Sequence, residues 1–173
     1  SLCVLDFDGD LSDHLAATGL SSPQTSWACF HTSMRVVTIG DVRCGIVPRT
    51  IGGPYAVLVA EQLRAAGARL IVGITSAGRV STNLPLPSIV VVRDAVRDEG
   101  TSLHYVAPTP TIITPTLAIV EPLVVELQAL GSQVRSGRVW TTDAPYRETT
   151  QQLQFWAEQS VLAVEMQAAS LFA

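Results

Sequence analysis

The sequence of 173 residues contains no lysine, and all 11 of its basic residues are arginine. This absence excludes chemistry that depends on a lysine, such as Schiff-base formation and the phosphate-binding loop of P-loop nucleotide hydrolases. Charged residues make up only 15% of the chain, and the formal net charge is −4. The sequence therefore lacks the basic footprint of a nucleic-acid-binding protein, and we predict no nucleic-acid partner.

Cysteines and long apolar runs are also scarce. The three cysteines, Cys3, Cys29 and Cys44, form no CxxC pair, which predicts reduced thiols and a cytoplasmic location. No run approaches the roughly 20 apolar residues of a membrane span, and no basic segment precedes an apolar one as in a signal peptide. We therefore predict no membrane partner. With 47% apolar residues, the chain is expected to form a single α/β domain over residues 1–173.

Short apolar runs alternate with helical patterns, which predicts an α/β fold with a mixed, parallel-rich central sheet flanked by helices. Leu70–Ile74 and 89–92 are β-branched runs without alternation, as in inner strands covered on both faces. A helix is expected to begin at Pro54. The other expected strands are 2–5, 35–39, 42–47, 134–140 and 161–164. The other expected helices are 11–18, 115–130, 151–160 and one beginning at Glu165, and 19–24 is expected to be a turn.

Four turns at expected strand ends carry glycine or acidic residues. Glycine lets backbone N–H groups approach an anion or a sugar, and a helix N-terminus adds its dipole. These turns are therefore candidate binding sites. They are Asp8-Gly9-Asp10, Gly52-Gly53-Pro54, Thr75-Ser76-Ala77-Gly78 and Glu165-Met166-Gln167.

Four segments carry a resemblance to a known family. Residues 96–105, VRDEGTSLHY, are similar to the RxDGTSxHY segment of the nucleoside phosphorylase-I family. This family includes purine nucleoside phosphorylases, uridine phosphorylases and methylthioadenosine-type nucleosidases. Residues 51–54 resemble its GIGGP turn, 142–146 its SDxFY base-pocket segment, and 164–169 its VEMEAA ribose-binding segment. The segments occur in the family's order over nearly the whole chain.

The resemblance implies a twisted, partly barrel-like mixed sheet and a homodimer or hexamer. It also implies cleavage of the N-glycosidic bond of a nucleoside through an oxocarbenium-like sugar, with a nucleoside or base as partner and no cofactor or metal. Met166 would lie under the ribose, and Gln167 replaces the glutamate that binds the ribose 2′ and 3′ hydroxyls. Tyr146 would flank the base. The implied substrate-binding residues, expected around one cleft, are Thr75, Ser76, Tyr146, Glu165, Met166 and Gln167.

The expected phosphate corner departs from the family pattern. Its backbone residues are Gly9, Asp10, Gly52 and Gly53. The family's three phosphate-binding arginines fall on Asp13, Val72 and Phe30. An acid in place of a bidentate arginine repels a dianion, which predicts weak or no phosphate binding. Arg49 and Arg79 remain possible substitutes.

The family's catalytic aspartate lies on a strand after the VEMEAA helix, and this sequence stops at Ala173, before that strand. We therefore expect the domain to lack the family's C-terminal strand and helix. Catalytic residues are left unassigned. Phosphorolysis, hydrolysis and a catalytically inactive protein that binds a nucleoside or base all remain open.

Residues 2–13 also resemble the first motif of haloacid dehalogenase-like phosphatases, with Asp6 as nucleophile and Asp8 as acid/base around Mg²⁺. The third motif of that family needs a lysine, which this chain lacks. We favour a solvated acidic loop for Asp6, Asp8, Asp10 and Asp13. A surface or dimer-face charge network is expected for Asp94, Arg97, Asp98 and Glu99.

Overall fold

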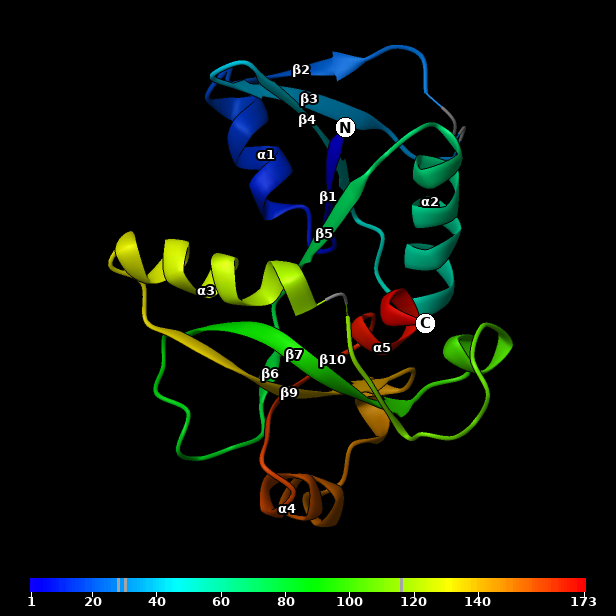
Figure 1. Ribbon diagram of the computed structural model, residues 1–173, viewed down its shortest axis with the longest axis vertical. Helices are drawn as coiled ribbons and strands as arrows, with labels where there is room; N and C mark the ends of the chain where they lie inside the picture. Colours follow the sequence, from blue (N-terminus) through cyan, green and yellow to red (C-terminus); the bar gives the residue numbers. More distant parts are fainter. Residues whose placement is uncertain (28, 30, 116) are drawn as a thin grey trace. The chain divides into compact units, whose positions relative to one another are not determined.

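The computed structural model describes residues 1–27, 29, 31–115 and 117–173, which form two units, Ser1–Ser76 and Ala77–Ala173 (Figure 1). Each unit is described by itself. The predicted α/β class with mixed sheets and flanking helices is confirmed. In the described residues the strands form two open five-stranded sheets, rather than one central sheet or a closed barrel. The prediction of a single domain stays a prediction.

The first unit is built on a sheet with the strand order β2-β3-β4-β1-β5. Its strands are β1 (Leu2–Asp6), β2 (Ser21–Gln24), β3 (Met34–Ile39), β4 (Val42–Pro48) and β5 (Leu70–Ile74), and its helices are α1 (Asp10–Ala17) and α2 (Gly53–Ala65). Figure 1 shows α1 and α2 on opposite sides of β1 and β5. The strands β4, β1 and β5 are parallel, so their carboxyl ends meet at one edge of the sheet.

Several sequence-based boundaries in this unit are confirmed, and two predictions are wrong. The hairpin turn at Gly40-Asp41 joins β3 to β4, and α2 includes Pro54 in its first turn. The segment expected to be a turn contains β2, which pairs with β3. β5 is an edge strand, and the side chain of Ile74 is 48% exposed. An apolar run without alternation therefore did not distinguish an edge strand from an inner one.

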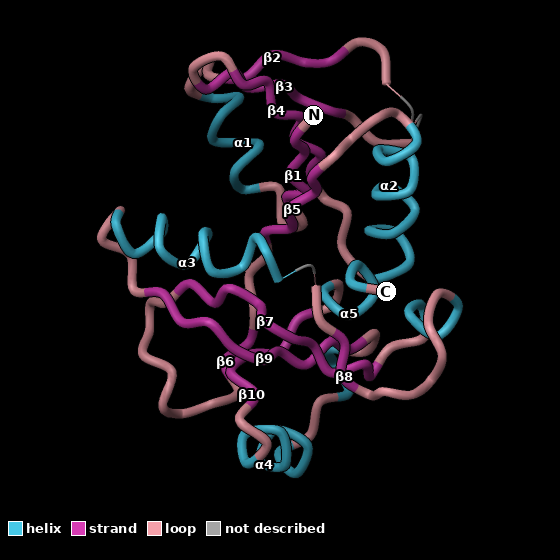
Figure 2. The backbone as a smooth tube through the Cα atoms, in the orientation of Figure 1, coloured by secondary structure: helices cyan, strands magenta, loops and turns pink. Residues whose placement is uncertain are grey.

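The second unit is built on a sheet with the strand order β6-β10-β9-β7-β8 (Figure 2). Its strands are β6 (Gly78–Arg79), β7 (Ile89–Asp98), β8 (Ile112–Ile113), β9 (Val134–Thr142) and β10 (Val161–Glu165). Its α-helices are α3 (Val120–Ala129), α4 (Thr150–Glu158) and α5 (Ala168–Phe172), and its 3₁₀ helices are η1 (Thr101–His104), η2 (Leu117–Ile119) and η3 (Pro145–Arg147). β7, β9 and β10 are parallel, and β7 is an inner strand as predicted.

Alternation along these three strands builds a core on each face of the second sheet. Trp140 and Val164 belong to a buried cluster that includes side chains of α4, whereas Val139 and Ala163 belong to a cluster that includes side chains of α5. Successive residues of a strand point to opposite faces of the sheet. Val139 and Trp140 therefore belong to different clusters, as do Ala163 and Val164. The carboxyl ends of the strands are thereby fixed between α4 and α5.

The last helix begins later than predicted. Glu165 is the last residue of β10, and α5 begins at Ala168. The helix expected from Pro115 instead begins at Val120, after η2. No helix in the described part of the chain is long and apolar enough to cross a membrane.

The expectation of a surface or dimer-face charge network is wrong for Asp94 and Glu99, because both are buried within the chain. Asp94 accepts hydrogen bonds from Arg93 and Arg138. Burial alone would raise the pKa of Asp94, but the hydrogen bonds and charges of the two arginines lower it below its ordinary value.

We expect Asp94→Asn to lower the free energy of unfolding by about 2 kcal/mol at pH 7, because it removes two charge-assisted hydrogen bonds. A lowered folded-state pKa stabilises the protein above the unfolded value of about 4, and this contribution is lost as the pH falls through the folded-state pKa. Urea unfolding at pH 7 and pH 3 measures this. A difference between wild type and variant that is equal at both pH values would contradict the ion-pair account.

Candidate functional site

The carboxyl ends of β1, β4 and β5 form a polar corner in the first unit. The register places Asp6 level with Pro48 of β4 and Ile74 of β5. The turns that follow the three strands therefore leave the sheet at the same edge, as at a ligand site in an open α/β sheet. Three of the predicted segments, around Gly9, Gly52 and Thr75, lie at these turns.

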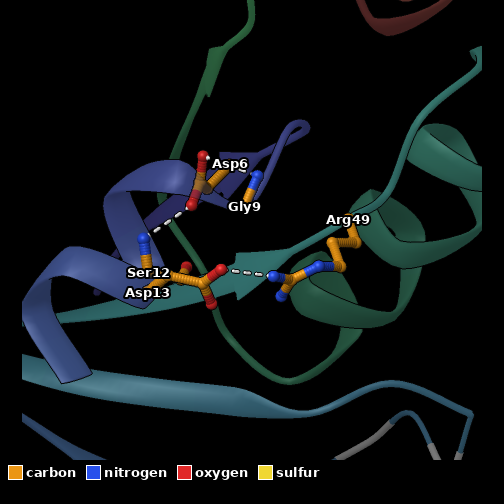
Figure 3. Close-up of polar contacts among 5 residues, drawn as sticks. All are labelled: Asp6, Gly9, Ser12, Asp13 and Arg49. Atoms are coloured by element: carbon orange, nitrogen blue, oxygen red, sulfur yellow. Dashed lines mark hydrogen bonds and ion pairs between the residues drawn. The ribbon is translucent and has the colours of Figure 1, made fainter. Parts of the chain in front are cut away.

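Asp6 holds the start of α1. Its carboxylate accepts hydrogen bonds from the backbone N–H of Gly9 at 3.2 Å and from that of Ser12 at 2.7 Å (Figure 3). Only 3% of Asp6 is exposed, so the prediction of a solvated loop is wrong for this residue. A helix leaves its first N–H groups without intrahelical partners, and here an internal carboxylate supplies a partner.

Arg49 reaches the same corner from the end of β4. Its guanidinium Nη2 donates to Asp13 Oδ2 at 2.5 Å, and the backbone N–H of Arg49 donates to the carbonyl of Asp6 at 2.8 Å. A Cβ on Gly9 would lie 2.9 Å from Cζ of Arg49, so the guanidinium packs against the bare Cα of Gly9. Gly9 also has φ of +92°, a conformation that favours glycine. Glycine thus permits both the turn and the close approach of Arg49.

Ser76 is held by Asp8 at the end of β5. Its backbone N–H donates to Asp8 Oδ2, and its hydroxyl donates to Asp8 Oδ1 at 3.2 Å. The Thr75 hydroxyl donates to the carbonyl of Ser76 at 3.0 Å. In this corner, Asp10 is exposed, whereas Gly53 is buried at the start of α2. Among the described residues, no group of three or more His, Cys, Asp or Glu side chains is placed to hold a metal ion.

Glu165 organises the strand ends of the second unit. The Thr141 hydroxyl donates to Glu165 Oε1 at 2.5 Å, and the backbone N–H groups of Gln167 and Ala168 donate to Oε2 at 2.6 and 2.8 Å. Thr141 in turn accepts from the N–H of Ala169 at 3.0 Å. Burial is the main cause that raises the pKa of Glu165. Both carboxylate oxygens therefore bind groups of the chain itself and fix the turn from β10 into α5.

Glu99 supports the same helix from the end of β7. Its Oε2 accepts from the Ser170 hydroxyl of α5 at 2.6 Å and from the backbone N–H of Ser102 at 2.9 Å. Burial alone would raise the pKa of Glu99, but these hydrogen bonds lower it. The 3₁₀ helix η1 and helix α5 are thus tied to one carboxylate.

Met166 and Gln167 form the turn that Glu165 holds. Gln167 is 2% exposed, and its Oε1 accepts from the backbone N–H of Met166 at 3.2 Å. Met166 is half-buried. Tyr146 lies in η3 and is 99% exposed.

A cavity of about 240 Å³ adjoins the segment that resembles a base pocket. The segment itself is anchored, because Asp143 Oδ2 accepts from the N–H of Gly100 at 2.8 Å. Burial raises the pKa of Glu148 at this cavity. The cavity is lined by Asp98, Trp140, Thr142, Asp143, Ala144, Arg147, Glu148 and Gln152.

Comparison with known proteins identifies the family. A family model described as the phosphorylase superfamily matches residues 7–173. The chain belongs to the phosphorylase superfamily. The haloacid dehalogenase-like alternative is therefore not retained.

Curated relatives agree with this membership, and a solved structure shares the fold. The chain is 28% identical over 71% of its length to a guanosine phosphorylase of Halorubrum lacusprofundi, covering 51% of that protein. It is 30% identical over 68% of its length to a uridine phosphorylase of Thermococcus kodakarensis, covering 43% of that protein. A crystal structure of uridine phosphorylase from Vibrio fischeri shares the fold with a TM-score of 0.86 and 20% identity, over 99% of this chain and 71% of that one. The chain spans about half the length of the curated relatives it matches.

The phosphorylase-superfamily segments fall into two groups. Thr75, Ser76 and the corner glycines lie in the first unit, whereas Tyr146 and Glu165–Gln167 lie in the second. In the second unit, Tyr146 follows β9, and Glu165 is the last residue of β10. The prediction that all of them surround one cleft stays a prediction. Val72 lies on β5, and Phe30 lies outside the described residues.

The sequence analysis assigned no role to Thr141 and a wrong one to Asp6, and both organise this phosphorylase-superfamily chain. Thr141 joins Glu165 to α5, and Asp6 binds the first turn of α1. A polar residue just inside the end of an apolar strand is the signal common to both. Arg49 was considered only as a substitute for a lost arginine, and its partner Asp13 was not foreseen.

Proposed function

We propose that this chain binds a nucleoside and cleaves its N-glycosidic bond, with water rather than phosphate as nucleophile. Membership in the phosphorylase superfamily supports the bond that is cleaved. The observation that supports water is the ion pair between Asp13 and Arg49, in the corner that resembles the family's phosphate site.

In the proposed reaction, the bond between C1′ and the base nitrogen breaks and its electrons leave with the base. The sugar passes through an oxocarbenium-like state. Water then adds its oxygen to C1′, and its proton ends on the base, so that the products are the free sugar and the free base. Such a reaction needs positioning and electrostatic support more than covalent catalysis.

The proposed ribose contacts are Met166 and Gln167. Gln167 Oε1 already accepts from the N–H of Met166, so the amide would bind a sugar hydroxyl through the second lone pair of Oε1 or through its NH₂ group. It carries no charge, so it supports a developing cation less than a glutamate would. Glu165 has no free carboxylate oxygen in the described structure, and its proposed role is to hold the backbone of Gln167. Tyr146 is proposed to flank the base.

Some of the donors of this corner are already bound to carboxylates of the chain. Asp6 binds the N–H groups of Gly9 and Ser12, and Asp13 binds the guanidinium of Arg49. An incoming dianion would have to compete with these two carboxylates at close range. Water is neutral and needs no cationic group to hold it, so this arrangement favours water over phosphate as the nucleophile.

A second candidate is a catalytically inactive protein that binds a nucleoside or base. The neutral Gln167 favours this alternative, because no free carboxylate in that turn would stabilise the cationic sugar. The predicted homodimer or hexamer, cytoplasmic location and lack of a cofactor stay predictions.

The test is a panel of purine and pyrimidine nucleosides incubated with the purified chain in phosphate-free buffer, with free base measured by chromatography. The proposal predicts base release from at least one nucleoside. Thermal shift with the same panel detects binding without cleavage. Binding with no base release from any nucleoside would reject the enzyme and support the binding protein.

A further inference from the structure

Arg49 is the cation of the corner at the carboxyl ends of β1 and β4. Its side chain is 57% exposed, so it is accessible to an anion from solvent. Its backbone has φ of +60°, in the left-handed region that non-glycine residues seldom adopt. The hydrogen bond from its N–H to the carbonyl of Asp6 holds that conformation. The start of the Arg49 side chain is therefore fixed by the fold.

The guanidinium is directed over the start of α1. It lies against Gly9, where a Cβ would come within 2.9 Å of Cζ, and it ends at Asp13 (Figure 3). Asp13 is 61% exposed and belongs to the first turn of α1. The two charges cancel at the place where the turn resembles a phosphate-binding loop.

Two other donors of this turn are already bound. The N–H groups of Gly9 and Ser12 are bound by Asp6, which is buried. Arg49 is the arginine described at this corner, and its guanidinium is held by Asp13.

We propose that Asp13 and Arg49 determine the nucleophile: Asp13 acts as a built-in competitor that holds Arg49, lowers the affinity of the corner for inorganic phosphate and so favours water. The choice of water as nucleophile rests on the proposed function. The competition between a carboxylate and phosphate for one guanidinium does not, and it is measured without any nucleoside.

The experiment compares inorganic phosphate binding by the wild-type chain, Asp13→Asn, Arg49→Gln and the double variant, by isothermal titration calorimetry at low salt. Asp13→Asn keeps the shape of the side chain and removes its charge. We expect this variant to bind phosphate about tenfold more tightly than wild type, the size of one charge-assisted contact at an exposed site. The double variant should lose the gain, and added salt should reduce it.

Asp41→Asn is the matched control, because it changes the net charge equally at an exposed hairpin far along β4 from Arg49. It should leave phosphate binding unchanged. Both partners of the ion pair are exposed, so circular dichroism should show all variants folded. An Asp13→Asn variant that gains no affinity, or whose gain persists without Arg49, would overturn the proposal.

Nucleoside cleavage is measured separately on the same variants. Tighter phosphate binding by Asp13→Asn, together with no base release from the wild-type chain, would support the competition and reject the proposed function. Base release by the wild-type chain, together with an Asp13→Asn variant of unchanged phosphate affinity, would support the proposed function and reject the competition. The two proposals therefore fail independently.

Discussion

Replacing Glu165 by Ala is expected to lower the free energy of unfolding by about 3 kcal/mol and nucleoside cleavage by more than about a hundredfold. The substitution leaves the Thr141 hydroxyl and the N–H groups of Gln167 and Ala168 buried without their acceptor. The turn that carries the proposed ribose contacts would lose its anchor. Urea unfolding and base release measure the two effects.

Glu165→Gln and Glu126→Ala separate positioning from a general loss of charge. Gln keeps one acceptor oxygen, so Glu165→Gln should retain more stability and activity than Glu165→Ala. Glu126 is exposed on α3, so Glu126→Ala should change neither quantity. A stable Glu165→Ala variant with full cleavage would contradict the positioning role.

Gln167→Ala is expected to lower kcat/KM for nucleoside cleavage by about a hundredfold, because it removes the proposed hydrogen bonds to the ribose hydroxyls. Gln167→Glu is expected to raise kcat by about tenfold, because a charged acceptor supports the cationic sugar more strongly than an amide does. Steady-state kinetics with a nucleoside that the wild-type chain cleaves measure both.

The pair of Gln167 variants tests the assignment and not only the stability of the turn. The side chain is buried, so unfolding of each variant is measured alongside its kinetics. If folded Gln167→Ala cleaves the nucleoside at the wild-type rate, Gln167 is not a ribose contact. If Gln167→Glu is slower than wild type while equally stable, the charge argument is wrong.

The positions of the candidate residues at strand ends were predictable from the sequence, because apolar runs indicate strands and polar turns follow them. Glu165 and Asp6 each lie at the end of such a run. The register then brings them level with Thr141 and Pro48, which local patterns do not encode. The proposed ribose and base contacts were predicted from the family segments. These residues are far apart in the sequence, so local patterns alone do not group them.

The partners of these residues were not predictable, because they depend on contacts distant in sequence. Asp13 and Arg49 are 36 positions apart, and Glu99 and Ser170 are 71 apart. The same prediction was made from the sequence for all the acidic residues of 6–13. In the structure, Asp6 is buried and accepts hydrogen bonds from backbone N–H groups, whereas Asp13 forms an ion pair with an exposed arginine. For β5, an apolar composition gave no information about its place at the sheet edge.

The most direct test of phosphate-independent cleavage is the identity of the sugar product. A nucleoside that the chain cleaves is incubated in ¹⁸O-labelled water with and without inorganic phosphate, and the sugar is analysed by mass spectrometry. We predict free sugar that carries the label at C1′, formed at the same rate in both buffers. A sugar 1-phosphate, formed at a rate that rises with phosphate concentration, would contradict the account.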